Sequence, residues 1–241
     1  MKKLSKILLI SLLAVFLAAG SAMAVPILDF NIDASHPTPA TISYAGGINE
    51  LIGSDIEVDD VLGLLTPLNS GVFLNLVSAT LNFTTGDSNG LWTWGGGPDS
   101  SISIIGGVDL DGGGIGLGDI PLGTTLLTGN FGSAEVTYSV NQFYVAIGSF
   151  SDIKEEALLE FYGLPAYLPN DDPWPYVGNF NISFLAPYDS DVGAGGMFSS
   201  TQVLSGDVFN TPVPEPATML LLGSGLIGLA GIGRKKFFKK V

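Results

Sequence analysis

The chain has 241 residues, 46% of them hydrophobic and 13% charged, and eight of its nine basic residues lie in the first six or the last eight positions. Between Val25 and Val213 a single lysine, Lys154, stands against 22 acidic residues, which gives this body a formal charge of −21. So acidic a body repels phosphate backbones, which excludes nucleic-acid binding. The absence of cysteine excludes disulfides and a lipidated N-terminal cysteine.

The first 24 residues have the features of a secretion signal. Three lysines among the first six positions precede the apolar run Ile7–Ala19, which only Ser11 interrupts. Ala22 and Ala24 then place small side chains at positions −3 and −1 of a cleavage site. The apolar run is short for a membrane-spanning helix, so we expect residues 1–24 to be a signal peptide cleaved after Ala24.

The body, residues 25–210, has the pattern of an all-β domain. Short runs alternate polar and apolar side chains and are separated by clusters of Gly, Asp, Asn and Pro. Only residues 152–162 favour a helix, which Gly163 can end. We therefore predict a β-sandwich or jelly-roll-like body with one short helix. The predicted strands cover residues 72–83 (with Phe73, Val77, Ala79, Leu81 and Phe83 on one face), 101–104, 135–141, 143–147 and 179–184.

A glycine-rich loop with three carboxylates is the first candidate site. Asp109, Asp111 and Asp119 could bind a hard cation such as Ca²⁺ through oxygen ligands. The loop lacks the glutamate that an EF-hand requires, because Ile120 stands there, and a calcium-binding nonapeptide occurs in one copy only. A glycine-rich hairpin without a cofactor is therefore expected, and a calcium site is the alternative. A second acidic cluster is a candidate cation site on the same grounds. It consists of Asp55, Glu57, Asp59 and Asp60.

Aromatic residues beside carboxylates make a second candidate. Asp171, Asp172, Trp174 and Tyr176 share a proline-rich segment, and exposed aromatic rings of this kind can stack on sugars. The alternative is that these rings, like Trp92 and Trp94, belong to the core. Catalysis has little support, because the lone His36 and the missing cysteines exclude a His-ligated zinc site and a thiol nucleophile. A glycosidase that uses two carboxylates stays open, but no pair stands out.

The C-terminal segment, residues 211–241, carries a second targeting signal. After a short linker at 210–212, Pro214 and Pro216 flank Glu215 and keep the chain extended. Residues 217–233 then contain no charge and form a predicted transmembrane helix. The basic tail, residues 234–241, is expected in the cytoplasm by the positive-inside tendency. The basic cluster at its start is Arg234, Lys235 and Lys236.

Val213-Pro214-Glu215-Pro216, the apolar helix and this basic cluster together resemble the PEP-CTERM sorting signal of Gram-negative bacteria. The resemblance implies a membrane enzyme, an exosortase, as a partner in strains that make exopolysaccharide. The N-terminal signal adds a signal peptidase as a second partner. It also implies an intermediate in the inner membrane, facing the periplasm, and a final place at the cell surface or outside the cell. Such tails occur on some ice-binding proteins as well, but the body has no regular Thr-x-Thr ladder.

From these observations we expect a non-enzymatic, exported protein of the surface or the extracellular matrix, linked to exopolysaccharide or biofilm. The alternatives are a carbohydrate- or calcium-binding matrix module and, less favoured, an ice-binding protein or a glycosidase.

Overall fold

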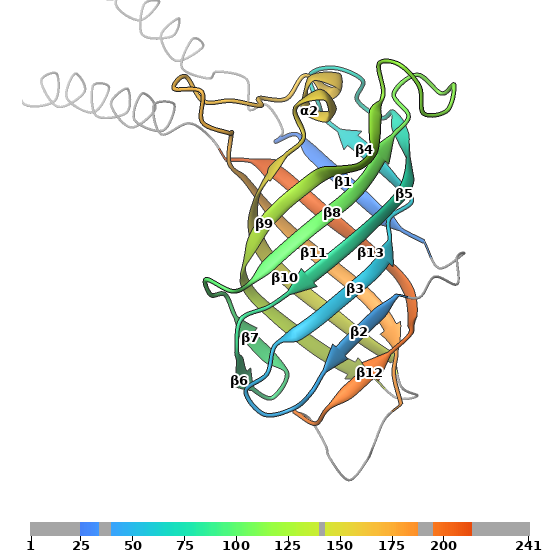
Figure 1. Ribbon diagram of the computed structural model, residues 1–241. Helices are drawn as coiled ribbons and strands as arrows, with labels where there is room; N and C mark the ends of the chain where they lie inside the picture. The colour runs from blue at the N-terminus through green and yellow to red at the C-terminus, as the bar shows by residue number, and fades with distance from the viewer. Residues whose placement is uncertain (1–24, 34–39, 140–142, 188–194, 214–241) are drawn as a thin grey trace, which may run out of the picture. The chain divides into compact units, whose positions relative to one another are not determined.

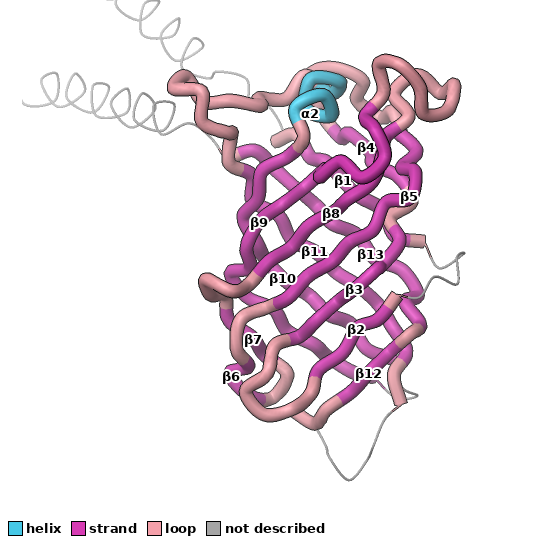
Figure 2. Tube along the Cα trace, in the orientation of Figure 1, coloured by secondary structure: helices cyan, strands magenta, loops and turns pink. Residues whose placement is uncertain are grey.

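The computed structural model describes residues 25–33, 40–139, 143–187 and 195–213. They belong to one unit, Val25–Val213, and within them the chain forms thirteen strands and one α-helix (Figures 1 and 2). The elements are β1 (Ile27–Ile32), β2 (Thr41–Tyr44), β3 (Leu51–Glu57), β4 (Asp60–Leu64), β5 (Phe73–Thr84), β6 (Ser88–Gly90), β7 (Thr93–Gly95), β8 (Ser101–Val108), β9 (Ile120–Ser139), β10 (Phe143–Lys154), α2 (Glu156–Tyr162), β11 (Tyr176–Leu185), β12 (Phe198–Ser200) and β13 (Gln202–Pro212).

Eight of these strands form a barrel-like sheet that closes on itself. Its order is β1, β4, β5, β8, β9, β10, β11, β13 and again β1, with every neighbouring pair antiparallel. At the end away from α2, β3, β2 and β12 extend from β5, while β7 and β6 extend from β9 (Figure 1). The prediction of an all-β body with one short helix is thus confirmed. Where a sandwich would keep two sheets apart, the pairing of β5 with β8 and of β4 with β1 joins the strands into one ring.

A bulge divides β5 into two halves with opposite inward faces. Ser78 has a φ of 51°, and the pairing of β5 with β8 shifts between Val77 and Thr80. Before the bulge Leu74 is buried and Phe73 is exposed, whereas after it Ala79 and its alternate neighbours point inward. One extra residue changes the phase of the side-chain alternation. The prediction that Phe73 shares a face with Phe83 is therefore wrong.

Aromatic rings fill the middle of the closed sheet. Phe83, Phe131 and Phe180 pack with ring centroids 5.3 to 5.8 Å apart. Glycines on the neighbouring strands, each paired with a phenylalanine, leave room for the rings. A Cβ at Gly148 would lie 2.3 Å from the Phe180 ring, and one at Gly53 would lie 2.1 Å from the Phe83 ring. The interior is therefore a packed core, in which ring size and glycine position are matched.

The helix is shorter than its sequence pattern predicts. Residues 152–154 continue β10, and α2 begins only at Glu156. Glu155 caps the helix by accepting a hydrogen bond from the backbone N–H of Leu158 at 2.9 Å, and Gly163 ends it in the left-handed conformation with a φ of 68°. The prediction of the Gly163 stop is confirmed, and the predicted start was wrong because residues 152–154 are paired with β9.

The expected linker at residues 210–212 is also wrong. Asn210 is buried, and Thr211 and Pro212 pair with Val177 and Tyr176 of β11. The backbone N–H of Val213 then donates to the carbonyl of Pro175 at 3.0 Å. The paired structure of the body thus continues beyond residue 210.

Candidate functional site

The loop between β8 and β9 brings its three aspartates together. Oxygen atoms of Asp109, Asp111 and Asp119 lie within 4.8 Å of one another, and in the described part of the chain this is the one such group of three or more acids or histidines. The second acidic cluster from the sequence, Asp55 to Asp60, forms no such group in these residues.

The same carboxylates also organise the loop backbone. Asp109 accepts hydrogen bonds from Gly112 and Gly114 at 2.7 and 2.8 Å, and Asp119 accepts them from Leu110 and Gly116 at 2.8 and 2.7 Å. The N–H group of Gly114, followed by that of Gly112, favours the charged form and lowers the pKa of Asp109. The loop therefore has internal partners for its carboxylates, together with the convergence of oxygen atoms that a cation would need.

The aromatic residues predicted to stack on sugars do not present their rings to solvent. Tyr176 is buried, and its hydroxyl donates to the carbonyl of Pro165 at 2.8 Å. Trp174 is 9% exposed, and its indole N–H donates to the carbonyl of Val213 at 3.1 Å. Asp171 and Asp172 are exposed. The prediction that these two rings are exposed for sugar stacking is wrong, because both are buried within the body.

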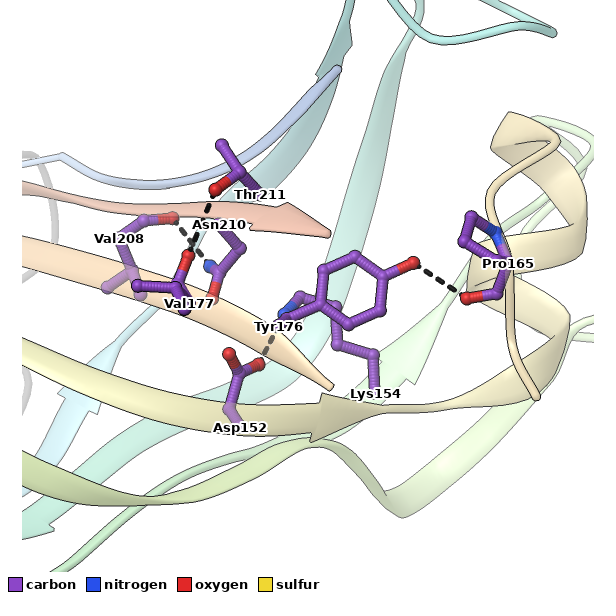
Figure 3. Close-up of polar contacts among 8 residues, drawn as sticks. All are labelled: Asp152, Lys154, Pro165, Tyr176, Val177, Val208, Asn210 and Thr211. Carbon is purple, nitrogen blue, oxygen red and sulfur yellow. Dashed lines mark hydrogen bonds and ion pairs between the residues drawn. The ribbon is translucent and has the colours of Figure 1, made fainter. Parts of the chain in front are cut away.

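The only basic residue of the body is buried beside an acid. Asp152 and Lys154, two apart on β10, point to the same side, and their side chains are fully buried and form an ion pair (Figure 3). The ammonium group lies 4.3 Å from the centroid of the Tyr176 ring. Sequence reasoning missed this pair, although a lone lysine two residues from an aspartate on a strand was a usable signal.

Burial shifts the titration of both partners. Desolvation lowers the pKa of Lys154 to about 8, and the nearby Asp152 carboxylate opposes this shift. Burial also raises the pKa of Asp152, against the effect of Lys154. One oxygen of Asp152 has no hydrogen-bond partner among the described residues, and the same holds for the side-chain oxygen of the buried Asn210. The pair is a buried polar element of the core, held by Coulomb attraction against a desolvation penalty.

Carboxylates on the outer side of β1, β4 and β13 are also perturbed. Burial raises the pKa of Asp29 to about 6, and the charges of Asp207 and Asp60 add to the rise. Burial likewise raises the pKa of Asp60, whereas a hydrogen bond from Asn31 lowers it. Burial therefore favours proton uptake by both carboxylates, and at Asp29 like charges on the neighbouring strands add to this effect.

Two shallow hollows lie on the outer face of β9 and β10. One, of about 490 Å³, is lined by short polar side chains such as Ser133, Ser149 and Asn179 together with Ile147 and Glu135. The other, of about 440 Å³, is lined by Ser101, Thr128, Asn130, Ser151 and Ile153 among others. The hollows adjoin along the strands, since Ser149 pairs with Ser133 and Ser151 with Asn130. Their linings contain one exposed charge, that of Glu135.

Comparison with known families adds one finding, at the chain's C-terminal region. The model of the PEP-CTERM protein-sorting motif matches residues 212–235. The chain carries a PEP-CTERM sorting signal. No curated protein and no solved structure matches the chain. The PEP-CTERM signal marks an exported protein that an exosortase, a membrane enzyme, processes.

Of the PEP-CTERM signal, the structure describes only Pro212 and Val213. The other predicted signal residues lie outside the described residues, as do the cleavage residues Ala22 and Ala24 and the predicted membrane helix at 217–233. No helix within the described residues is long and apolar enough to cross a membrane. The predicted sorting residues outside the description are Pro214, Glu215, Pro216, Arg234, Lys235 and Lys236.

Removing one partner of the buried ion pair is expected to destabilise the body. Lys154→Met leaves the Asp152 carboxylate buried without its counter-charge, and we expect the free energy of unfolding to fall by about 3–5 kcal/mol. The double variant Asp152→Leu/Lys154→Met removes both charges and should return to within about 1 kcal/mol of the wild type. Urea denaturation of the three proteins measures these differences. A double variant as unstable as Lys154→Met would contradict this account of the pair.

Metal removal tests the aspartate loop. Because its carboxylates have backbone donors, we expect a chelator or millimolar calcium to shift the melting temperature by less than about 1 °C. Thermal melts of the wild type and of Asp111→Asn, each with calcium and with chelator, provide the measurement. A larger rise with calcium that disappears in Asp111→Asn would show instead that the loop is a calcium site.

Proposed function

We propose that this protein is a non-enzymatic component of the cell surface or extracellular matrix, delivered there through its PEP-CTERM signal. One observation carries the proposal: the sorting motif begins at residue 212, where the last strand of the body ends. The proposal includes an inner-membrane intermediate of a Gram-negative cell and an association with exopolysaccharide. A signal peptidase and an exosortase are its processing partners.

The architecture of the body supports a binding or structural role over catalysis. Its interior is filled by aromatic and aliphatic side chains, and the hollows on β9 and β10 are shallow. Enzymes commonly place reactive groups in a deep concave site. Here the buried ion pair is enclosed in the core, and the acids of the β8–β9 loop accept backbone hydrogen bonds.

The sorting proposal is tested in the producing host with the full chain. Pro214→Ala/Glu215→Ala/Pro216→Ala should remain in the inner membrane with its C-terminal segment attached, whereas the wild type should lose this segment. Cell fractionation and intact-mass measurement distinguish these forms. Pro187→Ala, a change in an exposed residue of the body, serves as the control and should be processed like the wild type.

Equal membrane retention of the wild type and the triple variant, both with intact tails, would contradict exosortase processing of this chain. The segment would then serve as an anchor only.

The two outer hollows favour a second candidate function, the binding of an uncharged glycan. Hydroxyl and amide groups there can exchange hydrogen bonds with sugar hydroxyls, and the exposed Ile147 and Ile153 can contact the C–H faces of sugar rings. The body has a charge of −21, yet Glu135 is the one exposed acid lining this surface. A neutral polysaccharide would therefore meet little charge repulsion or carboxylate desolvation here.

Affinity electrophoresis in gels containing a neutral glucan tests this second function. We expect the wild type to be retarded and Ile147→Ala/Asn179→Ala to lose most of the retardation, because both a contact surface and a hydrogen-bonding group are removed. Ser199→Ala, an exposed change on β12 outside both hollows, is the control. Equal mobility of all three proteins with and without glucan would contradict glycan binding at this face.

A further inference from the structure

Large apolar side chains are exposed in the connection between β4 and β5 and at Phe73, the first residue of β5. Leu65, Leu68 and Phe73 are 59%, 56% and 60% exposed, and Val72 is exposed as well. The neighbouring β8–β9 loop adds the fully exposed Leu117. The β8–β9 loop lies beside β5, because the backbone N–H of Asp109 donates a hydrogen bond to the carbonyl of Asn75. We call residues 65–73 together with Leu117 the apolar end.

Hydrogen bonds hold the backbone of this connection in place. The N–H of Leu68 donates to the carbonyl of Tyr162 at 3.0 Å, and the N–H of Gly71 donates to that of Gly63 at 2.7 Å. The side chain of Asn69 donates to the carbonyl of Phe161 at 2.7 Å. Leu65 has a φ of 56°, a strained conformation for a leucine that gains little burial in return. The fold thus presents these apolar groups outward from a fixed backbone.

Both ends of the body lie at this same end of the sheet. Phe73 is paired with Leu62 of β4, and Leu62 is paired on its other side with Asp29, near the start of β1. Asp29 is also paired with Phe209, close to the end of β13. Figure 1 shows the starts of β1, β5 and β11 and the end of β13 gathered near α2.

The sequence beyond Val213 limits how far this end can be from a membrane. Three residues, Pro214 to Pro216, separate Val213 from the uncharged segment 217–233. Three extended residues span only about 10–11 Å. When segment 217–233 is inserted in a bilayer, the end of β13 is therefore held close to the lipid headgroups.

We propose that the apolar end is a lipid-contacting surface, which seats the body on the bilayer while the chain is anchored. The inference rests on the proposed function, because it requires the membrane intermediate. Exposed leucine and phenylalanine side chains favour the boundary between headgroups and acyl chains. Asp109, Asp111 and Asp119 lie in the adjoining loop and repel anionic lipids, so the partner is a zwitterionic lipid surface.

Site-specific fluorescence on the full chain in phosphatidylcholine vesicles tests this proposal. The chain has no cysteine, so a single introduced cysteine can carry an environment-sensitive label. Leu68→Cys and Phe73→Cys place the label at the apolar end. Ile48→Cys, a 74% exposed site in the β2–β3 connection at the opposite end, is the matched control. Vesicle flotation shows binding, and nitroxide-labelled lipids quench labels that reach the bilayer.

We expect the label at positions 68 and 73 to be quenched at least about twofold more than at position 48, since an interfacial group lies within about 5–10 Å of the acyl boundary. Equal quenching at all three positions in chains that float with the vesicles would overturn the lipid-contact proposal and leave the anchor intact. Failure of the full chain to float would overturn both the lipid contact and the membrane intermediate of the proposed function.

Discussion

Closure of the sheet is the constraint on which the other features of this body depend. The first strand, β1, pairs with β4 on one side and with the last strand, β13, on the other. Pairing between the first and the last strand therefore closes the sheet. Neither disulfides nor a balanced charge helps to hold the body together, since it has no cysteine and a formal charge of −21. Backbone pairing around a filled core has to provide the stability. The same pairing brings the start and the end of the body to one end of the sheet.

Burial of the single lysine places a charged pair in the core and leaves the surface of the body without a lysine or arginine. The Lys154 side chain lies in the core beside Asp152 and the Tyr176 ring, so the body presents acidic and neutral side chains to its surroundings. The acids are not spread evenly, because the hollows on β9 and β10 are lined mainly by serine, threonine and asparagine. The outer face of these strands is therefore nearly uncharged, whereas the β8–β9 loop carries three aspartates. Charge repulsion between copies of so acidic a body also favours solubility.

The start of the sorting signal and the hollows proposed to bind a glycan lie at different places on the body. Its sorting signal starts at the end of β13, near the exposed connection at residues 65–73, while the hollows lie along the side of the sheet. A body seated on a membrane by one end would keep its lateral faces open to the surroundings. This arrangement is compatible with binding both before and after the C-terminal segment is removed.

The sequence by itself determined the sorting motif, the all-β class and the helix stop at Gly163. These features depend on local order along the chain: Pro-Glu-Pro before an apolar run, alternation within short strands, and a glycine that adopts a left-handed conformation without strain. The strand positions at residues 101–104 and 179–184 followed from the same alternation.

Only the tertiary structure decided how those elements combine. Because of the bulge at Ser78, Phe73 points outward, and pairing with β11 makes residues 210–212 part of β13. Trp174 and Tyr176 are buried, the first bonded to Val213 and the second to Pro165. The convergence of Asp109, Asp111 and Asp119 likewise depends on the path of the whole loop. Ring closure depends on hydrogen bonds between strands distant in sequence, and a one-residue shift in a strand reverses its faces. Local patterns carry neither kind of information, so closure and the faces after a bulge could not be predicted from them.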